Sequence, residues 1–276
     1  MTTKNFYNTV YQKNHPSQYA GGDDGMPERT DELQTRTKEW LDLTGLSSIS
    51  TAELLEIGCG MAFLSNIHSG WHGAEFSKTA VDRVKNRDGY NTRIFEEDAQ
   101  SLSFKDASFD GVFTWAALEH VPDPNQACIE IDRVLKQEGY GLIAPAWNCR
   151  SWTVKKLEQR SNRELNWIEK IEKIFIPLRE IIIVRAMLAL PKRFLNELKL
   201  VVIRKPLRLQ FKILDPRWDM IEKYGHVSDD DAVADIDPHA GICFFKSRDY
   251  KIISHPNFLA RITARHKPLI VQKPKG

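Results

Sequence analysis

The sequence predicts an α/β fold, a doubly wound Rossmann-like sheet of seven mostly parallel strands with a mainly helical insert. Two observations predict it. The apolar run Leu54–Ile57 leads directly into the glycine turn at 58–62, which is the layout of a strand, a tight turn and a helix start in a nucleotide-binding βαβ unit. Strand-like runs then alternate with amphipathic helical stretches as far as Pro145, and this alternation implies parallel pairing with right-handed crossovers.

The first region, residues 1–45, is predicted to be an arm followed by a helix. Tyr7, Tyr11 and Tyr19 are spaced among polar residues, so we expect a mobile arm whose tyrosines are candidates for a lid over a ligand. From residue 27 to 43, apolar residues recur at a helical period that ends near Gly45.

The second region, residues 46–150, is predicted to be the ligand-binding core. After the first strand and its turn, Ser77 is placed to cap a helix. In chain order we expect a helix at 63–67, a strand at 73–77, a helix at 78–85, strands at 92–95 and 109–114, a helix at 125–135, and a strand at 141–145.

The alternation stops at Ser151 and resumes near Asp237-Pro238, a good N-cap and first-turn pair for a helix over 238–246. We therefore predict an insert at 151–228, and a region at 229–276 that completes the core sheet with strands at 250–253 and 267–272.

The insert has its own charge. The chain of 276 residues has a net charge of +2, but residues 151–228 carry 17 basic and 9 acidic residues, a net charge of +8. Bulky apolar runs alternate there with Lys and Arg, which fits either a helical cap over the active site or an amphipathic surface on anionic lipid. An insertion after the fifth strand lies at the carboxyl edge of the sheet, which favours the cap. The two interpretations are compatible.

Composition excludes several classes of protein. Cys59, Cys128, Cys149 and Cys243 are too widely separated for a zinc site or a disulfide framework, which is typical of a reducing cytoplasm. No N-terminal apolar signal and no run of eighteen uncharged apolar residues is present, so we expect a cytoplasmic protein, at most peripheral to the inner face of the membrane. The insert alternates its charges with aliphatic and not aromatic residues, which disfavours nucleic acid as a partner.

Carboxylates end the first three strands of the predicted core. Glu56 stands two residues before Gly58, where it would repel a pyrophosphate and attract a cationic ligand. Glu75 ends the second strand, where such folds place an acceptor for both ribose hydroxyls. Asp98, followed by Ala99, ends the third strand and is suited to an adenine amino group.

Five motifs in this order resemble the class I S-adenosylmethionine-dependent methyltransferases, in particular the small-molecule methyltransferase domain of the type 11 subgroup. The resemblance covers about residues 53–145. The matching stretches are 54–62, 73–77, 97–110, 117–124 and 133–141. The sequence departs from the family at Ala62, where the family has a third glycine, and at Gln137-Glu138, where it prefers Pro-Gly.

The resemblance implies that S-adenosyl-L-methionine is the cofactor. It places Glu56, Gly58 and Gly60 around the methionine part and Glu75 on the ribose, and it identifies further cofactor-binding candidates: Cys59 in the same turn, Phe76 on the adenine, Asp98 and the Ala99 backbone at its edge, and Trp115 facing the sulfonium.

His120 is the first candidate for a catalytic base, because the ordinary pKa of histidine lies near neutrality. The alternative is that His120 only caps the strand–helix junction or shapes the pocket. Candidate substrate residues are Tyr11, Tyr19, Glu119 and Trp147.

A group of potential metal ligands lies between residues 226 and 239: His226, Asp229, Asp230, Asp231, Asp235, Asp237 and His239. Its spacing matches no metal pattern, so we expect a solvated acidic loop with a helix cap at Asp237 and no metal.

We therefore expect methyl transfer to a small-molecule, sugar (glycan) or lipid-linked acceptor, on oxygen more than on carbon or nitrogen. The main alternative is a catalytically silent cofactor-binding or membrane-associated interaction protein, which the charge of the insert favours. A nicotinamide oxidoreductase is disfavoured by Glu56 and Ala62. The oligomeric state stays open.

Overall fold

The computed structural model describes residues 3–12, 27–87, 93–203, 205–227 and 229–276. Its elements in chain order are α1 (Thr3–Val10), α2 (Pro27–Thr44), η2 (Leu46–Ser48), β1 (Leu54–Ile57), β2 (Trp71–Glu75), α3 (Lys78–Lys85), β3 (Ile94–Glu96), β4 (Phe109–Trp115), η3 (Leu118–His120), α4 (Pro124–Val134), β5 (Leu135–Ala144), α5 (Ser151–Val154), α6 (Trp167–Ile174), α7 (Ile176–Glu180), α8 (Ile182–Val202), β6 (Phe211–Ile213), α9 (Trp218–Tyr224), β7 (Ala234–Ile236), α10 (Pro238–Lys246), β8 (Lys251–Ile252), α11 (Phe258–Ile262) and β9 (Leu269–Gln272).

One sheet of seven strands organises the molecule, which confirms the predicted fold class. The strand order is β3-β2-β1-β4-β5-β9-β8. The first five strands pair in parallel, and β9 runs antiparallel to both of its neighbours. The order reverses between β1 and β4, so the carboxyl ends of these strands form the crevice where ligands bind in open α/β sheets.

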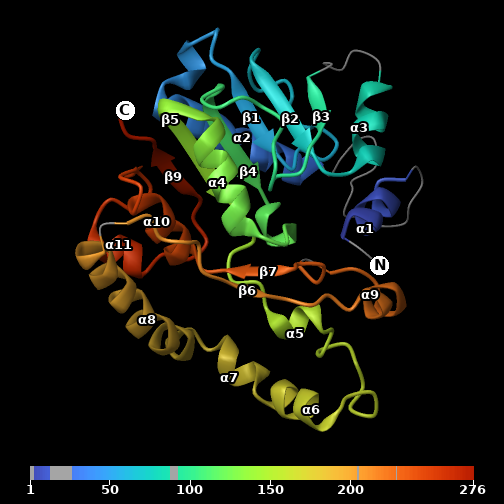
Figure 1. Cartoon of the computed structure of the whole chain (residues 1–276). Coiled ribbons are helices and arrows are strands. Elements are labelled where there is room, and N and C mark those ends of the chain that lie inside the picture. The colour runs from blue at the N-terminus through green and yellow to red at the C-terminus, as the bar shows by residue number, and fades with distance from the viewer. Residues whose placement is uncertain (1–2, 13–26, 88–92, 204, 228) are drawn as a thin grey trace.

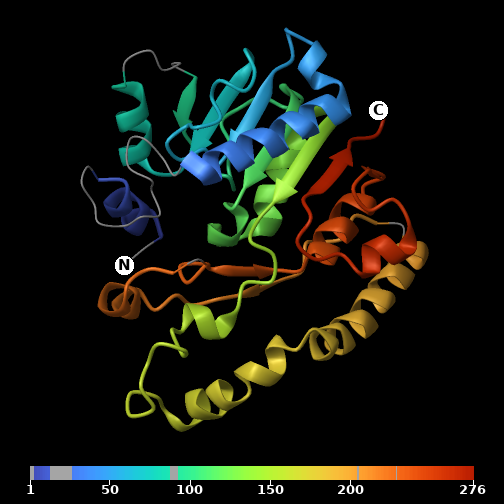
Figure 2. The same ribbon diagram turned by 180° about the vertical axis from the view of Figure 1, so that it is seen from behind.

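Helices cover both faces of the sheet because alternate strand residues point to opposite sides. Leu54 joins the cluster that packs on α2 and α3, whereas its neighbour Leu55 joins the cluster that packs on α4 and α10. All four residues of β1 are buried, as expected for a central parallel strand. Figure 1 shows α4 in front of the sheet, and Figure 2, from behind, shows α2 across the other face.

The predicted insert forms an arc at one end of the molecule. Helices α5 to α8 follow β5, and α8 returns along the side of α10 and α11 (Figure 1). The insert also contains a strand that the sequence analysis did not predict, since β6 pairs with β7 in a separate two-stranded antiparallel sheet. Among the described helices, none is both long and apolar enough to cross a membrane.

Most predicted elements of the core are confirmed, but the helix expected at 63–67 is wrong. Three-residue turns take its place, with hydrogen bonds from the backbone N–H of Ala62, Ser65 and Ile67 to the carbonyls three residues earlier. Ala62, directly before this stretch, has a φ of 58°, in the left-handed region, so no right-handed helix begins within the glycine turn. The caps at Ser77 and Asp237 are confirmed, because each side chain accepts a hydrogen bond from the first turn of its helix.

The N-terminal arm differs in part from the expectation of a mobile segment. Residues Thr3–Val10 form α1, whose Asn8 accepts a hydrogen bond from the Ser77 hydroxyl at 2.8 Å. This contact fixes α1 beside the start of α3. Tyr19 lies outside the described residues.

Gln137-Glu138, which stands where the family prefers Pro-Gly, has a conformational cost. Phe109 pairs with Leu135 and Gly111 with Tyr140, so the chain bulges between them, and Glu138 has a φ of 62° there. A glycine adopts this conformation without the clash of a Cβ.

We expect Glu138→Gly to raise the free energy of unfolding by about 1 kcal/mol, after the larger entropy of the unfolded glycine is subtracted. The exposed Glu138–Lys275 ion pair offsets little of this gain. Urea denaturation measures the change. Gln137→Gly is the matched control and should be destabilising, because Gln137 is exposed and outside the left-handed region; equal effects of both variants would contradict the strain at Glu138.

Candidate functional site

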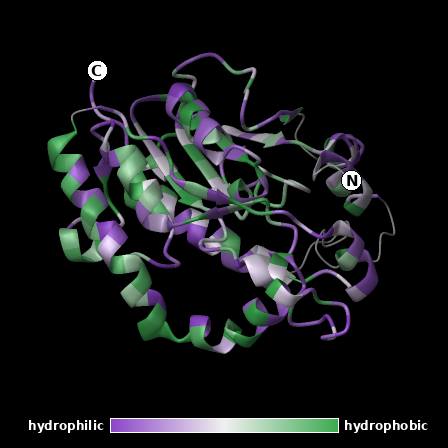
Figure 3. Ribbon diagram, turned by 60° about the horizontal axis from the view of Figure 1, so that its bottom comes forward, coloured by the Kyte–Doolittle hydropathy of each residue, from purple (hydrophilic) through white to green (hydrophobic). Residues whose placement is uncertain are grey.

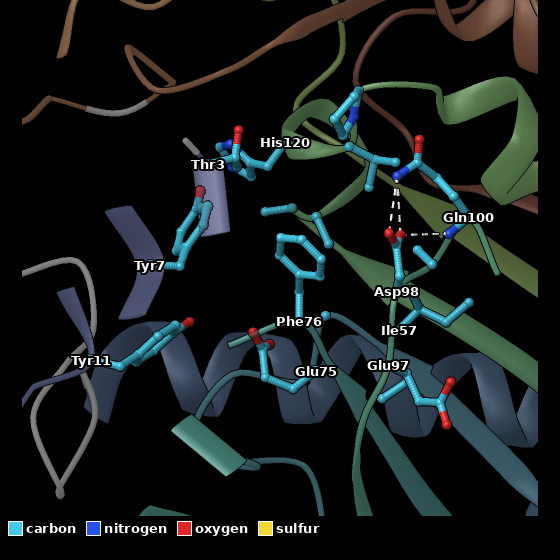
Figure 4. Close-up of a pocket in the computed structure, with 17 residues that line it drawn as sticks. Thr3, Tyr7, Tyr11, Ile57, Glu75, Phe76, Glu97, Asp98, Gln100 and His120 are labelled. Carbon is cyan, nitrogen blue, oxygen red and sulfur yellow. Dashed lines mark hydrogen bonds between the residues drawn. The ribbon is translucent and has the colours of Figure 1, made fainter. Parts of the chain in front are cut away.

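A pocket lies at the carboxyl ends of β1, β2, β3 and β4 and encloses about 740 Å³ of empty space, part of it open to solvent. This volume suits a nucleoside-sized ligand. Its lining residues, most of them shown in Figure 4, are Thr3, Tyr7, Tyr11, Ile57, Gly58, Ala74, Glu75, Phe76, Glu97, Asp98, Ala99, Gln100, Ala116, Ala117, His120, Val121 and Pro122.

The glycine turn forms one wall of the pocket through its backbone. Gly58 has a φ of 74°, and a Cβ at this position would lie 2.4 Å from the Cβ of Ala117, so no larger residue fits. Gly60 has a φ of 52°, and a Cβ there would lie 3.0 Å from the Tyr11 hydroxyl. The turn therefore lets the segment after β4 and the N-terminal helix approach closely.

Glu75 holds this turn against the end of β2. Its Oε2 accepts a hydrogen bond from the Gly60 N–H at 2.9 Å and its Oε1 accepts one from the Ser77 N–H at 2.8 Å. The side chain is buried, and burial raises the pKa of Glu75, although the N–H groups of Ser77 and Gly60 act in the opposite direction. Each oxygen keeps one lone pair for a ligand hydroxyl.

The segment after β3 forms the opposite wall. Asp98 Oδ1 accepts hydrogen bonds from the Gln100 N–H at 2.9 Å and from its amide Nε2 at 3.1 Å. Phe76 lies in the same space (Figure 4), and Lys4 of α1 lies 5.0 Å from the centre of its ring. The pocket thus combines carboxylate acceptors with an aromatic face and the small apolar side chains of Ala74 and Ala99.

Two tyrosines cover the pocket, Tyr7 of α1 and Tyr11 directly after this helix. Figure 4 shows Tyr7 pointing toward His120 and Tyr11 toward Glu75. The Tyr7 hydroxyl donates a hydrogen bond to Asp231 Oδ2 at 2.5 Å, across 224 residues of sequence. The element that covers the site in this structure is therefore α1, and none of the described residues of 151–228 lines the pocket, contrary to the expected cap.

His120 stands at the rim between two carboxylates. Its Nδ1 lies 3.6 Å from Asp231 Oδ2, and its Nε2 lies 3.6 Å from Glu119 Oε1. Burial favours the neutral ring and lowers its pKa, but Asp231 and Glu119 outweigh burial, so the pKa of His120 is raised. Burial likewise raises the pKa of Glu119, whose side chain is fully buried under the histidine.

The structure corrects the role expected for Glu56. Its carboxyl group accepts a hydrogen bond from the Trp71 Nε1 at 2.8 Å in the buried layer and is not part of the pocket lining. Burial raises the pKa of Glu56 to about 8, with Trp71 opposing this and Glu75 adding to it. A raised pKa favours the protonated form of Glu56, which lacks the negative charge that the sequence argument assigned to this residue.

Besides Glu56, five predicted residues lie outside the pocket lining: Cys59, Gly60, Trp115, Trp147 and Glu119, which is buried beside His120. The side chain of Cys59 is buried in the core on the α2 side, and Gly60 contributes its backbone through Glu75. Trp115 points to α2, where its Nε1 donates to Thr37 Oγ1 at 3.0 Å, and Trp147 packs beside Gly241. Because side chains alternate along β4, the tryptophan at its end turns to the helix layer and away from the crevice.

The acidic segment at 226–239 is not the solvated loop that we expected. Asp230 is fully buried and forms ion pairs with Lys156 and with His226, the latter at 2.6 Å. Ligand atoms of His226, Asp230 and Asp231 lie within 4.8 Å of one another, and the Lys156 ammonium already pairs with Asp230 in this group. Asp231 faces His120, and the sequence analysis had no signal for that pairing because the partners come from distant segments.

Comparisons with known proteins agree with this geometry. Residues 55–143 match the family described as a methyltransferase domain. The chain is 29% identical over 124 residues to the O-methyltransferase rstn1 of Aspergillus nomiae, covering 40% of this chain and 54% of that protein. It is 31% identical over 104 residues to the 2-methyl-6-phytyl-1,4-hydroquinone methyltransferase of Synechocystis sp., covering 35% and 32%. The matches thus span about half and about a third of these relatives.

Among solved structures, the YcgJ protein of Bacillus subtilis aligns over 85% of this chain and 97% of its own, with 18% identity and a TM-score of 0.40. CalS10, an amino pentose methyltransferase from Micromonospora echinaspora solved with S-adenosylmethionine, aligns over 43% of this chain and 51% of its own, with 16% identity and a TM-score of 0.36.

The buried Glu56 predicts a specific dependence of stability on pH. The pKa of Glu56 in the folded protein, about 8, lies above its ordinary value of 4.5. The contribution of Glu56 to the free energy of unfolding is therefore complete below pH 4.5 and is lost as the pH rises toward 8. This loss lowers the free energy of unfolding of the wild type by up to about 1.4 kcal/mol per pH unit. We expect Glu56→Gln, which keeps an acceptor for Trp71, to remove this pH dependence.

Chemical denaturation between pH 5 and 9 compares the two proteins, with the exposed Glu39→Gln as control. Parallel pH curves for wild type and Glu56→Gln would show that Glu56 ionises normally in the folded protein.

Proposed function

Because the chain carries a class I S-adenosylmethionine-dependent methyltransferase domain, we propose that the protein transfers a methyl group from S-adenosylmethionine to an oxygen of a small-molecule, sugar or lipid-linked acceptor. The observation that carries this proposal is the joint position of Glu75, Asp98 and His120 in one pocket at the carboxyl edge of the sheet.

The residues of the pocket fit an adenosyl group. Glu75 keeps free lone pairs on both oxygens, which suits the two hydroxyls of a ribose, and its own backbone bonds hold it in place. Asp98, Ala99 and Phe76 line the same pocket, and in this proposal Asp98 and the Ala99 backbone bind the polar edge of the adenine while Phe76 packs on its face. A Cβ at Gly58 would collide with Ala117, so glycine here keeps the two sides of the crevice close together.

S-adenosylmethionine supplies a methyl group bound to a positively charged sulfur, and little chemistry is left to the protein. The S–CH₃ bond breaks as the O–CH₃ bond forms, and the hydroxyl proton of the acceptor has to leave. In the proposed mechanism His120 accepts this proton. Asp231 and Glu119 stabilise the resulting imidazolium, and Tyr7 of α1 and the following Tyr11 help to exclude water.

The raised pKa of His120 gives this step a defined pH dependence. The imidazolium has to lose its proton before the ring accepts another, so the transfer becomes faster as the pH rises through the pKa of His120. The same carboxylates that stabilise the product of the proton transfer therefore limit the reaction at low pH.

The relatives bear on the class of acceptor. One relative is named as an O-methyltransferase and another as a hydroquinone methyltransferase, and this favours a hydroxyl-bearing small molecule. A screen for methylated product over sugar, lipid and quinol acceptors tests the acceptor class directly. The alternative, a cofactor-binding protein without turnover, predicts affinity for S-adenosylmethionine and no methylated product in any arm of the screen.

We expect Glu75→Ala to weaken the binding of S-adenosylmethionine by roughly 1.5–3 kcal/mol, about tenfold to more than a hundredfold in Kd, because charged hydrogen bonds to the ribose are lost. Isothermal titration calorimetry measures Kd, and thermal unfolding checks that the variant folds without the bonds to Gly60 and Ser77.

Glu75→Gln keeps a similar shape and an acceptor, and should lie between the wild type and Glu75→Ala. The exposed Glu39→Ala is the control. Unchanged affinity in a folded Glu75→Ala variant would place the ribose elsewhere.

We expect His120→Asn to lower turnover by roughly a hundredfold or more, while the Kd for the cofactor changes little, because the proton acceptor is lost and the ribose contacts remain. The rise of turnover with pH should also disappear. Steady-state kinetics with an acceptor from the screen, measured across pH, gives both readouts, and the exposed His266→Asn serves as control. If cofactor affinity and turnover fall together, His120 shapes the pocket and is not the base.

A further inference from the structure

The outward faces of α6, α7 and α8 are unusually apolar. Of the 26 large apolar residues that are exposed in the described chain, 17 lie between Trp167 and Val202. We call them the α6–α8 surface: Trp167, Ile168, Ile171, Ile174, Phe175, Leu178, Ile181, Ile182, Ile183, Met187, Leu188, Leu190, Phe194, Leu195, Leu198, Val201 and Val202. Figure 3 shows this apolar character in green along the arc of the insert.

In α6 the charged face points inward. The helix begins with a capping box at Asn166, and its two glutamates turn to the body of the insert. Glu169 binds the nearly buried Arg160 at 2.8 Å, and Glu172 binds Lys155 at 2.6 Å. The helix is strongly amphipathic, but the face against the protein is the acidic one, the reverse of an ordinary surface helix.

The same inversion occurs in α8. Its two buried residues are the charged Arg193 and Glu197. Arg193 binds Asp237 at 2.9 Å and donates to the backbone carbonyls of Ile262 and Ala264, and Glu197 binds Arg261 at 2.7 Å. These ion pairs attach α8 to α10 and α11. The apolar residues are left on the outside, so their exposure follows from how the helix is docked.

The ion pairs of the acidic side chains leave basic side chains as the exposed charges on the helices of the α6–α8 surface. All four acidic residues of α6–α8 bind a basic partner, the fourth being Glu180 with Arg150 at 3.0 Å. The charged residues that are classed as exposed on these helices are all basic: Lys170, Arg179, Lys192 and Lys199. An apolar face with basic residues among it is complementary to a bilayer with anionic headgroups.

We propose that the α6–α8 surface docks the protein on an anionic lipid bilayer, with the three helices lying in the interface. A second copy of the chain is disfavoured as the occupant, because pairing the surface with itself would bring the exposed lysines of both copies together. The exposed apolar area continues from α8 onto α11. Phe194 of α8 meets Phe258 of α11 at 6.2 Å between ring centres, and Leu259 extends the apolar area at 66% exposure.

This inference is separate from the proposed methyl transfer, since no residue of the α6–α8 surface lines the pocket. In both views of the ribbon the arc lies on the far side of the β6–β7 sheet from the pocket edge of the main sheet (Figures 1 and 2). Docking through the α6–α8 surface would therefore leave the pocket uncovered.

Vesicle flotation of the full chain tests the proposal with phosphatidylcholine alone and with phosphatidylcholine containing phosphatidylserine. We expect the wild type to float with the anionic vesicles, with recovery roughly tenfold lower for neutral ones. Glu75→Ala should float like the wild type, which separates this test from a failure of the proposed function. Equal recovery with both vesicles, or no flotation with either, would overturn the proposal.

Two variants probe the two parts of the surface. A triple variant with Ile183→Ser, Met187→Ser and Leu188→Ser should abolish flotation. Because the three side chains are 66–72% exposed, their replacement should leave the fold intact. Lys192→Glu with Lys199→Glu should abolish the preference for anionic vesicles.

The matched controls lie away from the surface and should float like the wild type. Leu43→Ser, Ile49→Ser and Ile129→Ser test exposed apolar residues elsewhere, and Lys38→Glu with Lys251→Glu makes the same charge change at other exposed positions. Sedimentation velocity without lipid completes the design. A concentration-dependent dimer that the serine variant abolishes would mean that a second copy covers the surface, contrary to the proposal.

Discussion

The two hydrogen bonds of the Glu75 carboxylate connect most of the pocket. They join the Gly60 N–H in the turn after β1 to the Ser77 N–H at the start of α3, so one buried side chain at the end of β2 sets the distance between three segments. The turn accepts this position because Gly58, Gly60 and Ala62 all take positive φ values. Removing the acceptor would leave backbone donors unpaired in a dry environment, which costs more than the bonds contribute.

The second connection runs through Asp231, which follows the insert. It accepts a hydrogen bond from Tyr7 of α1 and faces His120 after β4, so the loop after α9 helps to hold the N-terminal helix over the pocket. The segment directly after the insert therefore contributes to the site. Its helices α6–α8 are bound by ion pairs to neighbouring segments and, at α10 and α11, to the C-terminal region, and this leaves their apolar sides outside.

Much of the core was predictable because it follows from local rules. The buried run Leu54–Ile57, the glycine turn and the caps at Ser77 and Asp237 are encoded within a few residues each, and the positions of Glu75, Phe76 and Asp98 follow from the parallel strands before them. The tryptophans were harder to place. Trp115 and Trp147 were assigned to the site from their chain positions, but the alternation along β4 and the packing at Gly241 turn them into other layers.

The sequence by itself determined the order of strands and helices, the glycine turn and the carboxylates at the strand ends, because each depends on periodicity or on neighbours in the chain. Only the tertiary structure decided three things: that Glu56 is buried against Trp71, that Asp231 lies beside His120, and that α6 and α8 turn their charged faces inward. Amphipathic periodicity shows that a helix has two faces. Which face meets the protein depends on the partners that the rest of the fold brings to it, here Arg160, Asp237 and Arg261.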